Sequence, residues 1–169
     1  MLLRMRMLGF FLLLVVVVAA VVGFMGAALP AEHTVTRTVL VPAEPERVFA
    51  QISLVQDYPH WRTGVKRVDL LPEQDGKFHW QEVTSMGTIP QVLTENEPLT
   101  RRVVTIADPS LPWGGSWTYE LEPQGSQTQL TITEDGYVSN VFFRFMSRYV
   151  FGQASTLEQY ESDLVKAMQ

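Results

Sequence analysis

The chain has 169 residues, of which 46% are hydrophobic and 18% are charged. This length suggests one domain, and this composition excludes a disordered tail protein. The absence of cysteine excludes a disulfide scaffold, a thiolate zinc site, a cysteine nucleophile and a lipid-modified N-terminal cysteine. The net charge is −5, but the first 31 residues hold two arginines and no acid, so residues 32–169 carry −7. That acidity argues against a nucleic-acid partner, because phosphate binding needs a basic surface.

The N-terminal segment 1–31 predicts a membrane association. Residues 7–31 carry no charge, and the stretch 8–25 within them is almost wholly apolar, which is close to the roughly 20 residues that span a bilayer and longer than the roughly 7–15 of a signal-peptide core. We expect a single-pass anchor over residues 7–29. Arg4 and Arg6 precede it, which predicts a cytoplasmic N-terminus and places residues 32–169 on the outer side. The alternative is a signal sequence cleaved after Ala28, which would leave the domain secreted.

The remainder predicts one strand, two short helices and then six more strands. Residues 34–41 are rich in valine and threonine and predict a strand. A short helix is expected over 44–52 and a second helix or turn over 55–61. Alternating apolar and polar residues then predict an antiparallel meander. Its expected strands are residues 65–71 (ended by Pro72), 77–86, 89–95, 101–107, 116–123 and 127–137.

The last segment, residues 139–169, predicts a single long amphipathic helix. It contains no proline, and its apolar residues recur mostly at three- and four-residue steps. Ser139 or Asn140 is the expected N-cap. Gly152 lies in the middle, where glycine lowers helix propensity by about 1 kcal/mol and favours a kink.

This order of elements resembles that of the START-like, or SRPBCC, superfamily, in its polyketide cyclase/dehydrase and lipid-transport branch. The segments that carry the resemblance are TVLVPAEPERVFAQI (38–52), DYPHW (57–61) with VKRV (65–68), and GSWTYEL (115–121) with residues 128–133. It covers nearly all of residues 34–169. It implies an α+β helix-grip fold, in which a curved antiparallel sheet of six to seven strands surrounds a long C-terminal helix.

The resemblance also implies a cavity between sheet and helix for a hydrophobic ligand, such as a lipid, a quinone or a polyketide-like ring. The superfold hosts enzymes, carriers and receptors, so the fold alone does not fix the function. Apolar walls with a few polar groups are typical of such a pocket. The alternative is that the aromatic rings on these faces only fill the core. The candidate ligand contacts are Phe78, Trp80, Trp117 and Tyr119 on strands and Phe142, Phe143, Met146 and Tyr149 on the long helix.

Three charged residues, Arg37, Glu82 and Glu134, share the strand parity of apolar neighbours. A buried charge must be paired, and an inward Arg37 between carboxylates would satisfy this rule. Arg37 and Glu82 are therefore candidates for holding a polar group of the ligand. The alternative is that Glu82 and Glu134 turn to water near their strand ends. For an enzyme, these three residues and Tyr119 would be the acid/base candidates.

Residues 108–115 predict a loop with Leu111 and Trp113 between two prolines and two glycines. We expect a lid over the cavity mouth or a tip that enters lipid, with Gly114 and Gly115 as a hinge. The alternative is a loop that folds back onto the sheet.

No motif indicates a metal centre, a cofactor or a nucleophilic serine. His33, expected in the linker, His60 and His79 lack metal-ligand spacing. The sequence predicts membrane-tethered binding or transport of a hydrophobic small molecule. The alternatives are a cyclase- or aromatase-type enzyme acting on such a molecule and a non-enzymatic interaction protein with a closed core. The sequence indicates no specific protein partner.

Overall fold

A computed structural model describes residues 2–85, 87–152 and 154–169 of the chain. The helices and helical turns are α1 (Leu2–Ala28), α2 (Pro45–Ser53), η1 (Val55–Asp57), α3 (Tyr58–Trp61), α4 (Val141–Met146), η2 (Ser147–Phe151) and α5 (Ser155–Ala167). The strands are β1 (Glu32–Val41), β2 (Val65–Gln74), β3 (Lys77–Thr84), β4 (Gly87–Glu97), β5 (Arg101–Ile106), β6 (Trp113–Gln124) and β7 (Gln127–Val138).

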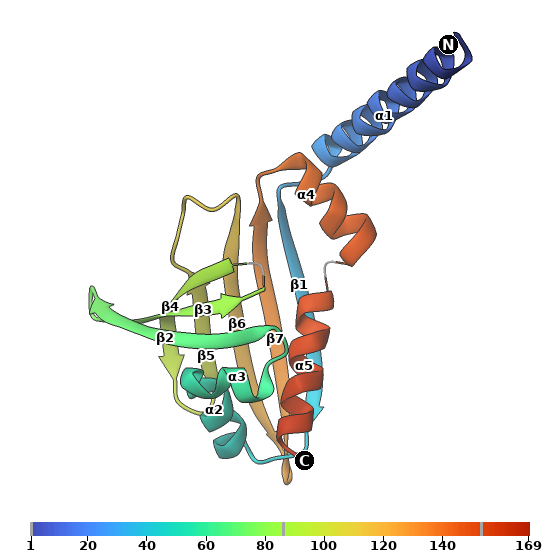
Figure 1. The fold of residues 1–169 in the computed structure, drawn as a ribbon. Coiled ribbons are helices and arrows are strands. Elements are labelled where there is room, and N and C mark those ends of the chain that lie inside the picture. The colour runs from blue at the N-terminus through green and yellow to red at the C-terminus, as the bar shows by residue number, and fades with distance from the viewer. Residues whose placement is uncertain (1, 86, 153) are drawn as a thin grey trace.

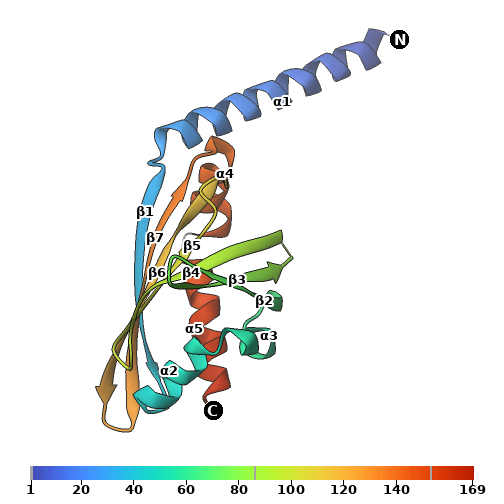
Figure 2. The same cartoon turned by 90° about the vertical axis from the view of Figure 1, so that its left-hand side faces the viewer.

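The seven strands form one antiparallel sheet in the order β1-β7-β6-β5-β4-β3-β2. The sheet curves, and α2, α3 and α5 lie on its concave side (Figures 1 and 2). The expected helix-grip α+β fold is therefore confirmed.

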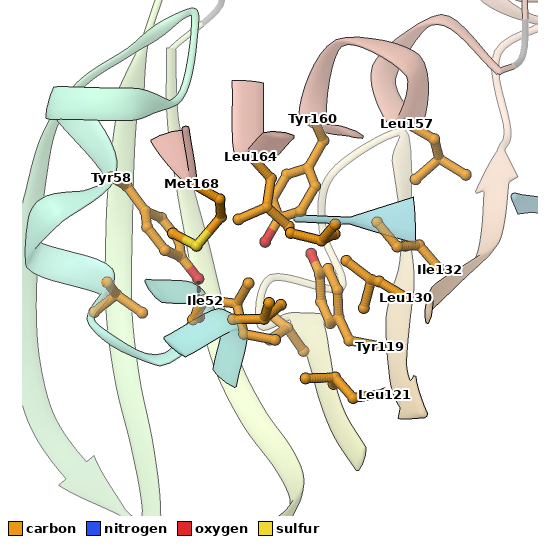
Figure 3. Packing of buried hydrophobic residues seen from close by; sticks show 14 of the residues in the cluster. Ile52, Tyr58, Tyr119, Leu121, Leu130, Ile132, Leu157, Tyr160, Leu164 and Met168 are labelled. Atoms are coloured by element: carbon orange, nitrogen blue, oxygen red, sulfur yellow. Dashed lines mark hydrogen bonds between the residues drawn. The ribbon is translucent and has the colours of Figure 1, made fainter. Parts of the chain in front are cut away.

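The buried core lies between the concave face and these helices (Figure 3). Strands β3 and β7 contribute Trp80, Leu130 and Ile132, and α5 contributes Leu157 and Leu164, all at most 2% exposed. The two α5 residues are seven positions apart, so they lie on one face of the helix. Burial of this stripe is what holds the C-terminal helix to the sheet.

β1 shows the alternation that a half-buried strand requires. From Glu32 to Leu40 its residues alternate between exposed and half-buried positions. His33 has the parity of the inward residues Val35, Arg37 and Val39. The expectation that His33 lies in a linker is therefore wrong, because the strand begins two residues before the predicted Thr34.

The expectation that Pro72 ends its strand is also wrong, because β2 continues to Gln74. β2 forms one edge of the sheet, and its register with β3 shifts between Leu71 and Gln74. Proline is tolerated at an edge strand or a bulge because no ladder hydrogen bond is lost there.

The C-terminal segment is two helical pieces rather than the single long helix expected. Asn140 caps the first piece, as predicted, because its side chain accepts hydrogen bonds from the backbone N–H groups of Phe142 and Phe143. The helical path then stops at Gly152, which has a φ of 81° and a ψ of 131°. This backbone conformation is incompatible with a helix and favours glycine.

Replacing Gly152 with alanine is expected to lower the free energy of unfolding by about 1–3 kcal/mol, because a Cβ strains this positive-φ conformation. Chemical unfolding followed by far-UV circular dichroism measures the change, with Thr156→Ala at an exposed position of α5 as the control. A Gly152→Ala chain of unchanged stability and higher helix content would contradict the expectation, because α4 and α5 would then have joined.

α1 projects away from the domain and leaves its apolar side chains exposed (Figure 1). Gly9–Ala28 is long and apolar enough to cross a membrane. At its C-terminal end, Gly26 is buried so closely against the Val141 carbonyl that a Cβ there would overlap it. Arg144 of α4 also donates from Nη1 to the Leu29 carbonyl oxygen at 2.9 Å. The apolar helix is thus attached to the domain through α4.

Candidate ligand-binding interior

Two carboxylates on the concave face, Glu82 of β3 and Glu134 of β7, are shielded from water. Glu82 is 4% exposed, and the side chain of Glu134 is 13% exposed. Each accepts a hydrogen bond from an indole: Trp80 Nε1 donates to Glu82 at 3.3 Å, and Trp117 Nε1 donates to Glu134 at 2.9 Å. Both carboxylates therefore face the interior, as their strand parity indicates, and the expectation that they turn to water near their strand ends is wrong.

Arg62, directly after α3, completes the Glu82 cluster. Its Nη1 donates to Glu82 Oε1 at 2.8 Å. Its guanidinium lies over the rings of Tyr58 and Tyr160, at 4.6 and 5.1 Å from their centroids. Burial acts to lower the pKa of Arg62, but the charge of Glu82 and the surrounding tyrosines together raise that pKa above its ordinary value. The cluster is therefore an ion pair enclosed by aromatic rings.

His33 completes the Glu134 cluster, with its Nε2 3.2 Å from Glu134 Oε1. Trp117 and Glu134 lie opposite each other in the register of β6 and β7. Gly136 provides the space for the imidazole, because a Cβ at that position would lie 2.5 Å from the ring. A carboxylate, an imidazole and an indole thus meet on the concave face, which is a combination capable of holding or moving a proton.

Arg37 is paired with carboxylates, as predicted, and both carboxylates belong to α5. Its Nε donates to Glu161 at 2.9 Å and its Nη1 donates to Glu158 at 3.1 Å. The hydrogen bond to Glu161 raises the pKa of Arg37. Arg37 therefore joins β1 to α5, and contact between Arg37 and a ligand stays a prediction.

The predicted aromatic contacts on the strands face the interior. Trp80 and Tyr119 are buried, and Phe78 and Trp117 are partly buried against the core. Phe78 stacks on Trp80 with ring centroids 5.4 Å apart. Their contact with a ligand stays a prediction.

The predicted aromatic contacts on the C-terminal segment lie differently. Phe142 and Phe143 are each 51% exposed, Tyr149 is 55% exposed, and Met146 is half-buried. The inward orientation expected of the three aromatic residues is therefore wrong. The physical reason is the break at Gly152. Because the helix ends there, α4 and η2 do not continue along the axis of α5 across the sheet.

The predicted lid is only partly a loop. Leu111 lies in the loop and is half-buried, but Trp113 begins β6, where it is paired with Val138. The glycines that follow are strand residues, and not the expected hinge. A Cβ at Gly114 would collide with the Tyr137 ring, so packing against the neighbouring strand accounts for this glycine.

Three tyrosines, Tyr58, Tyr119 and Tyr160, converge in the interior. The rings of Tyr119 and Tyr160 are 5.5 Å apart, and their hydroxyls point toward each other (Figure 3). Burial raises the pKa of all three phenols above the ordinary value.

This tyrosine cluster predicts a loss of stability that begins near pH 10. Phenols in the unfolded chain ionise at about pH 10, whereas the fold keeps these three protonated. Unfolding then releases protons, so the free energy of unfolding falls as the pH rises from about 10 toward the raised pKa values. Unfolding midpoints measured across this range should fall less steeply for Tyr160→Phe. The control is Tyr149→Phe at an exposed ring, and an unchanged slope for Tyr160→Phe would contradict the expectation.

Among the buried polar atoms of this region that have no hydrogen-bond partner within the described residues, two lie beside the aromatic rings. They are Nε1 of Trp61, which packs edge-on against Tyr160, and Oε1 of Gln91, which lies opposite Trp80 in the sheet. A buried polar atom without a partner is unfavourable by about 1–3 kcal/mol. A ligand hydroxyl could accept from Trp61 Nε1 or donate to Gln91 Oε1, and a ligand carbonyl could accept from Trp61 Nε1.

An open pocket of about 370 Å³ lies on the opposite face of the sheet. Thr105, Ser116 and Asp135, which are in register across β5, β6 and β7, line it together with residues 107–109 and Tyr137. This pocket contains none of the predicted ligand contacts and none of the indole-bound carboxylates. The interior is therefore the stronger candidate site.

We compared the chain with known protein families, curated proteins and solved structures. Residues 32–160 match the family model described as polyketide cyclase / dehydrase and lipid transport. No curated protein matches the chain.

Several solved structures are similar in fold. The Zhui aromatase/cyclase from Streptomyces sp. R1128 has 13% identity and a TM-score of 0.64, covering 82% of this chain and 96% of its own. A START superfamily protein from Mycobacterium smegmatis has 17% identity and a TM-score of 0.60, covering 80% and 97%. Norcoclaurine synthase from Thalictrum flavum has 12% identity and a TM-score of 0.61, covering 81% and 94%. At these identities the likeness shows the fold alone.

Proposed function

We propose that the domain binds a hydrophobic small molecule on the concave side of the sheet. The premise is that the chain belongs to the polyketide cyclase/dehydrase and lipid-transport family. The observation that carries this proposal is an aromatic interior with few, fixed polar groups. Indole-bound Glu82 and Glu134 lie in it, and Trp61 and Gln91 have polar atoms without a partner among the described residues. Apolar walls with a few oriented polar groups suit an amphipathic ligand such as a lipid, a quinone or a polyketide-like ring.

We further propose that α1 holds the domain at the outer face of a membrane. Gly9–Ala28 has 20 residues, and at about 1.5 Å per residue it matches a hydrocarbon core of about 30 Å. Arg4 and Arg6 at its start favour a cytoplasmic N-terminus. Tethering would keep the domain where an apolar ligand is concentrated. Cleavage after Ala28, the alternative, would release it.

A second candidate function is catalysis of the cyclase or aromatase type. The observation that favours it is the contact of His33 with Glu134 beside an aromatic wall. In such an enzyme the pair would take up or deliver a proton while the rings orient the substrate. Replacement of His33 by glutamine should then abolish turnover and leave ligand binding intact.

Native mass spectrometry of the full chain released from detergent tests the binding proposal, followed by solvent extraction and identification of any bound molecule. One defined apolar molecule per chain is the expected result. Glu134→Gln should weaken its retention, whereas Glu120→Gln on the exposed face should not. A ligand-free mass that stays unchanged after incubation with a lipid extract would contradict binding and favour an interaction protein with a closed core.

A further inference from the structure

The segment of α4 and η2 combines exposed apolar side chains with positive charge. Its exposed apolar residues, each at least 38% accessible, are Val141, Phe142, Phe143, Tyr149 and Val150. The segment carries Arg144 and Arg148, and residues 136–157 contain no acid. This composition contrasts with residues 32–169, whose net charge is −7.

The position of this segment is set by its contact with the apolar helix. Val141 packs on Gly26 near the C-terminal end of α1, and Arg144 bonds the Leu29 carbonyl oxygen. Both views show α4 beside that end of α1 (Figures 1 and 2). When α1 spans a bilayer, its C-terminal end lies at the outer interface, and α4 must lie at the same depth.

We propose that α4 and η2 form a second membrane contact, which seats the domain on the headgroup region of an anionic bilayer. This inference rests on the proposed tethering by α1. Aromatic side chains are enriched at the membrane interface, where an amphipathic ring meets both apolar and polar surroundings. Anionic headgroups attract basic side chains held close to the surface. The apolar rings of the segment enter the interface, and Arg148, which is exposed, pairs with the headgroups.

Seating the domain in this way places the Gly152 break beside the lipid. The segment that precedes the break then contacts the bilayer, and α5, which follows it, closes the interior.

Site-specific fluorescence quenching on the full chain tests the proposal. Because the chain lacks cysteine, single substitutions carry an environment-sensitive label at Val150→Cys on η2, Val16→Cys in α1 and Ser126→Cys in the β6–β7 turn at the far end of the domain. The labelled chains are reconstituted into phosphatidylcholine vesicles with or without phosphatidylglycerol, both containing nitroxide-bearing phospholipid. Circular dichroism verifies that each variant is folded.

The expected result is strong quenching at positions 16 and 150 and none at position 126. Quenching at position 150 reports how much of the α4 and η2 segment is bound to lipid. When phosphatidylglycerol is present, Arg148→Gln should lower the ratio of bound to unbound segment about fivefold. Without phosphatidylglycerol it should have little effect. Arg47→Gln, at an exposed arginine on α2, is the matched control and should change nothing.

Quenching at position 16 without quenching at position 150 would overturn this inference and leave the tether intact. An unquenched label at position 16 would overturn the tether and the inference together. A label at position 150 could instead be shielded from water but not quenched by the lipid. If that shielding increased with the density of protein in the vesicle, the surface of α4 and η2 would contact a second copy of the chain, and the bilayer contact would be overturned.

Discussion

Replacing Glu82 with leucine is expected to lower the free energy of unfolding by about 3–5 kcal/mol. The substitution leaves the guanidinium of Arg62 without its counter-charge, in a site where only 22% of the Arg62 side chain is exposed. It also removes the acceptor for the Trp80 indole. Chemical unfolding of the full chain in detergent micelles, followed by tryptophan fluorescence, measures the change.

Two controls separate the lost pairing from general damage. In the double variant Arg62→Met with Glu82→Leu, no charge is left unpaired, so most of the stability should return. Glu120→Leu breaks an exposed ion pair with Arg101 and should change stability by about 0–1 kcal/mol. A Glu82→Leu chain as stable as the parent would contradict the role assigned to this pair.

Leu164→Ala in α5 is expected to lower the free energy of unfolding by about 2–5 kcal/mol. Leu164 is fully buried in the core, so truncation removes apolar contacts and leaves a cavity. Phe142→Ala in α4 removes a larger side chain but should change stability by only about 0.5 kcal/mol, because half of that ring is already exposed.

The same unfolding assay in detergent compares the two variants. A large loss for Phe142→Ala would mean that α4 belongs to the core. That result would also remove the basis for a lipid contact, since the ring would then be stabilising the fold.

Most of the sheet could be predicted because its strands have one buried face. The two-residue period of Phe78, Trp80 and Glu82 identifies the inward side of β3, and burial confirms it. The same rule applies to His33, which shares the parity of Val35 and Arg37 and lies in β1 rather than in the expected linker. The expected end of the second strand, in contrast, rests on Pro72, which an edge bulge accommodates inside β2.

The charge partner of Glu82 could not be predicted, because it comes from a segment without a strand period. Arg62 follows a four-residue helix, and no parity rule says which way a residue at such a helix end points. Its partner Glu82 lies 20 residues away in the sequence. The sequence predicts a kink at Gly152 but not a complete break, because helix propensity gives only the local preference of glycine, whereas packing decides its backbone angles.

The close packing of Gly26 on Val141, together with the Arg144 clamp on the Leu29 carbonyl, has a mechanical consequence. A helix held in this way cannot swivel freely relative to the domain that it carries. A membrane-spanning helix responds to a thinner bilayer by tilting. If α1 spans a bilayer, as proposed, such a tilt is transmitted through α4 as a rotation of the whole sheet relative to the membrane plane. Bilayer thickness would then be a variable that sets the orientation of the proposed ligand-binding interior.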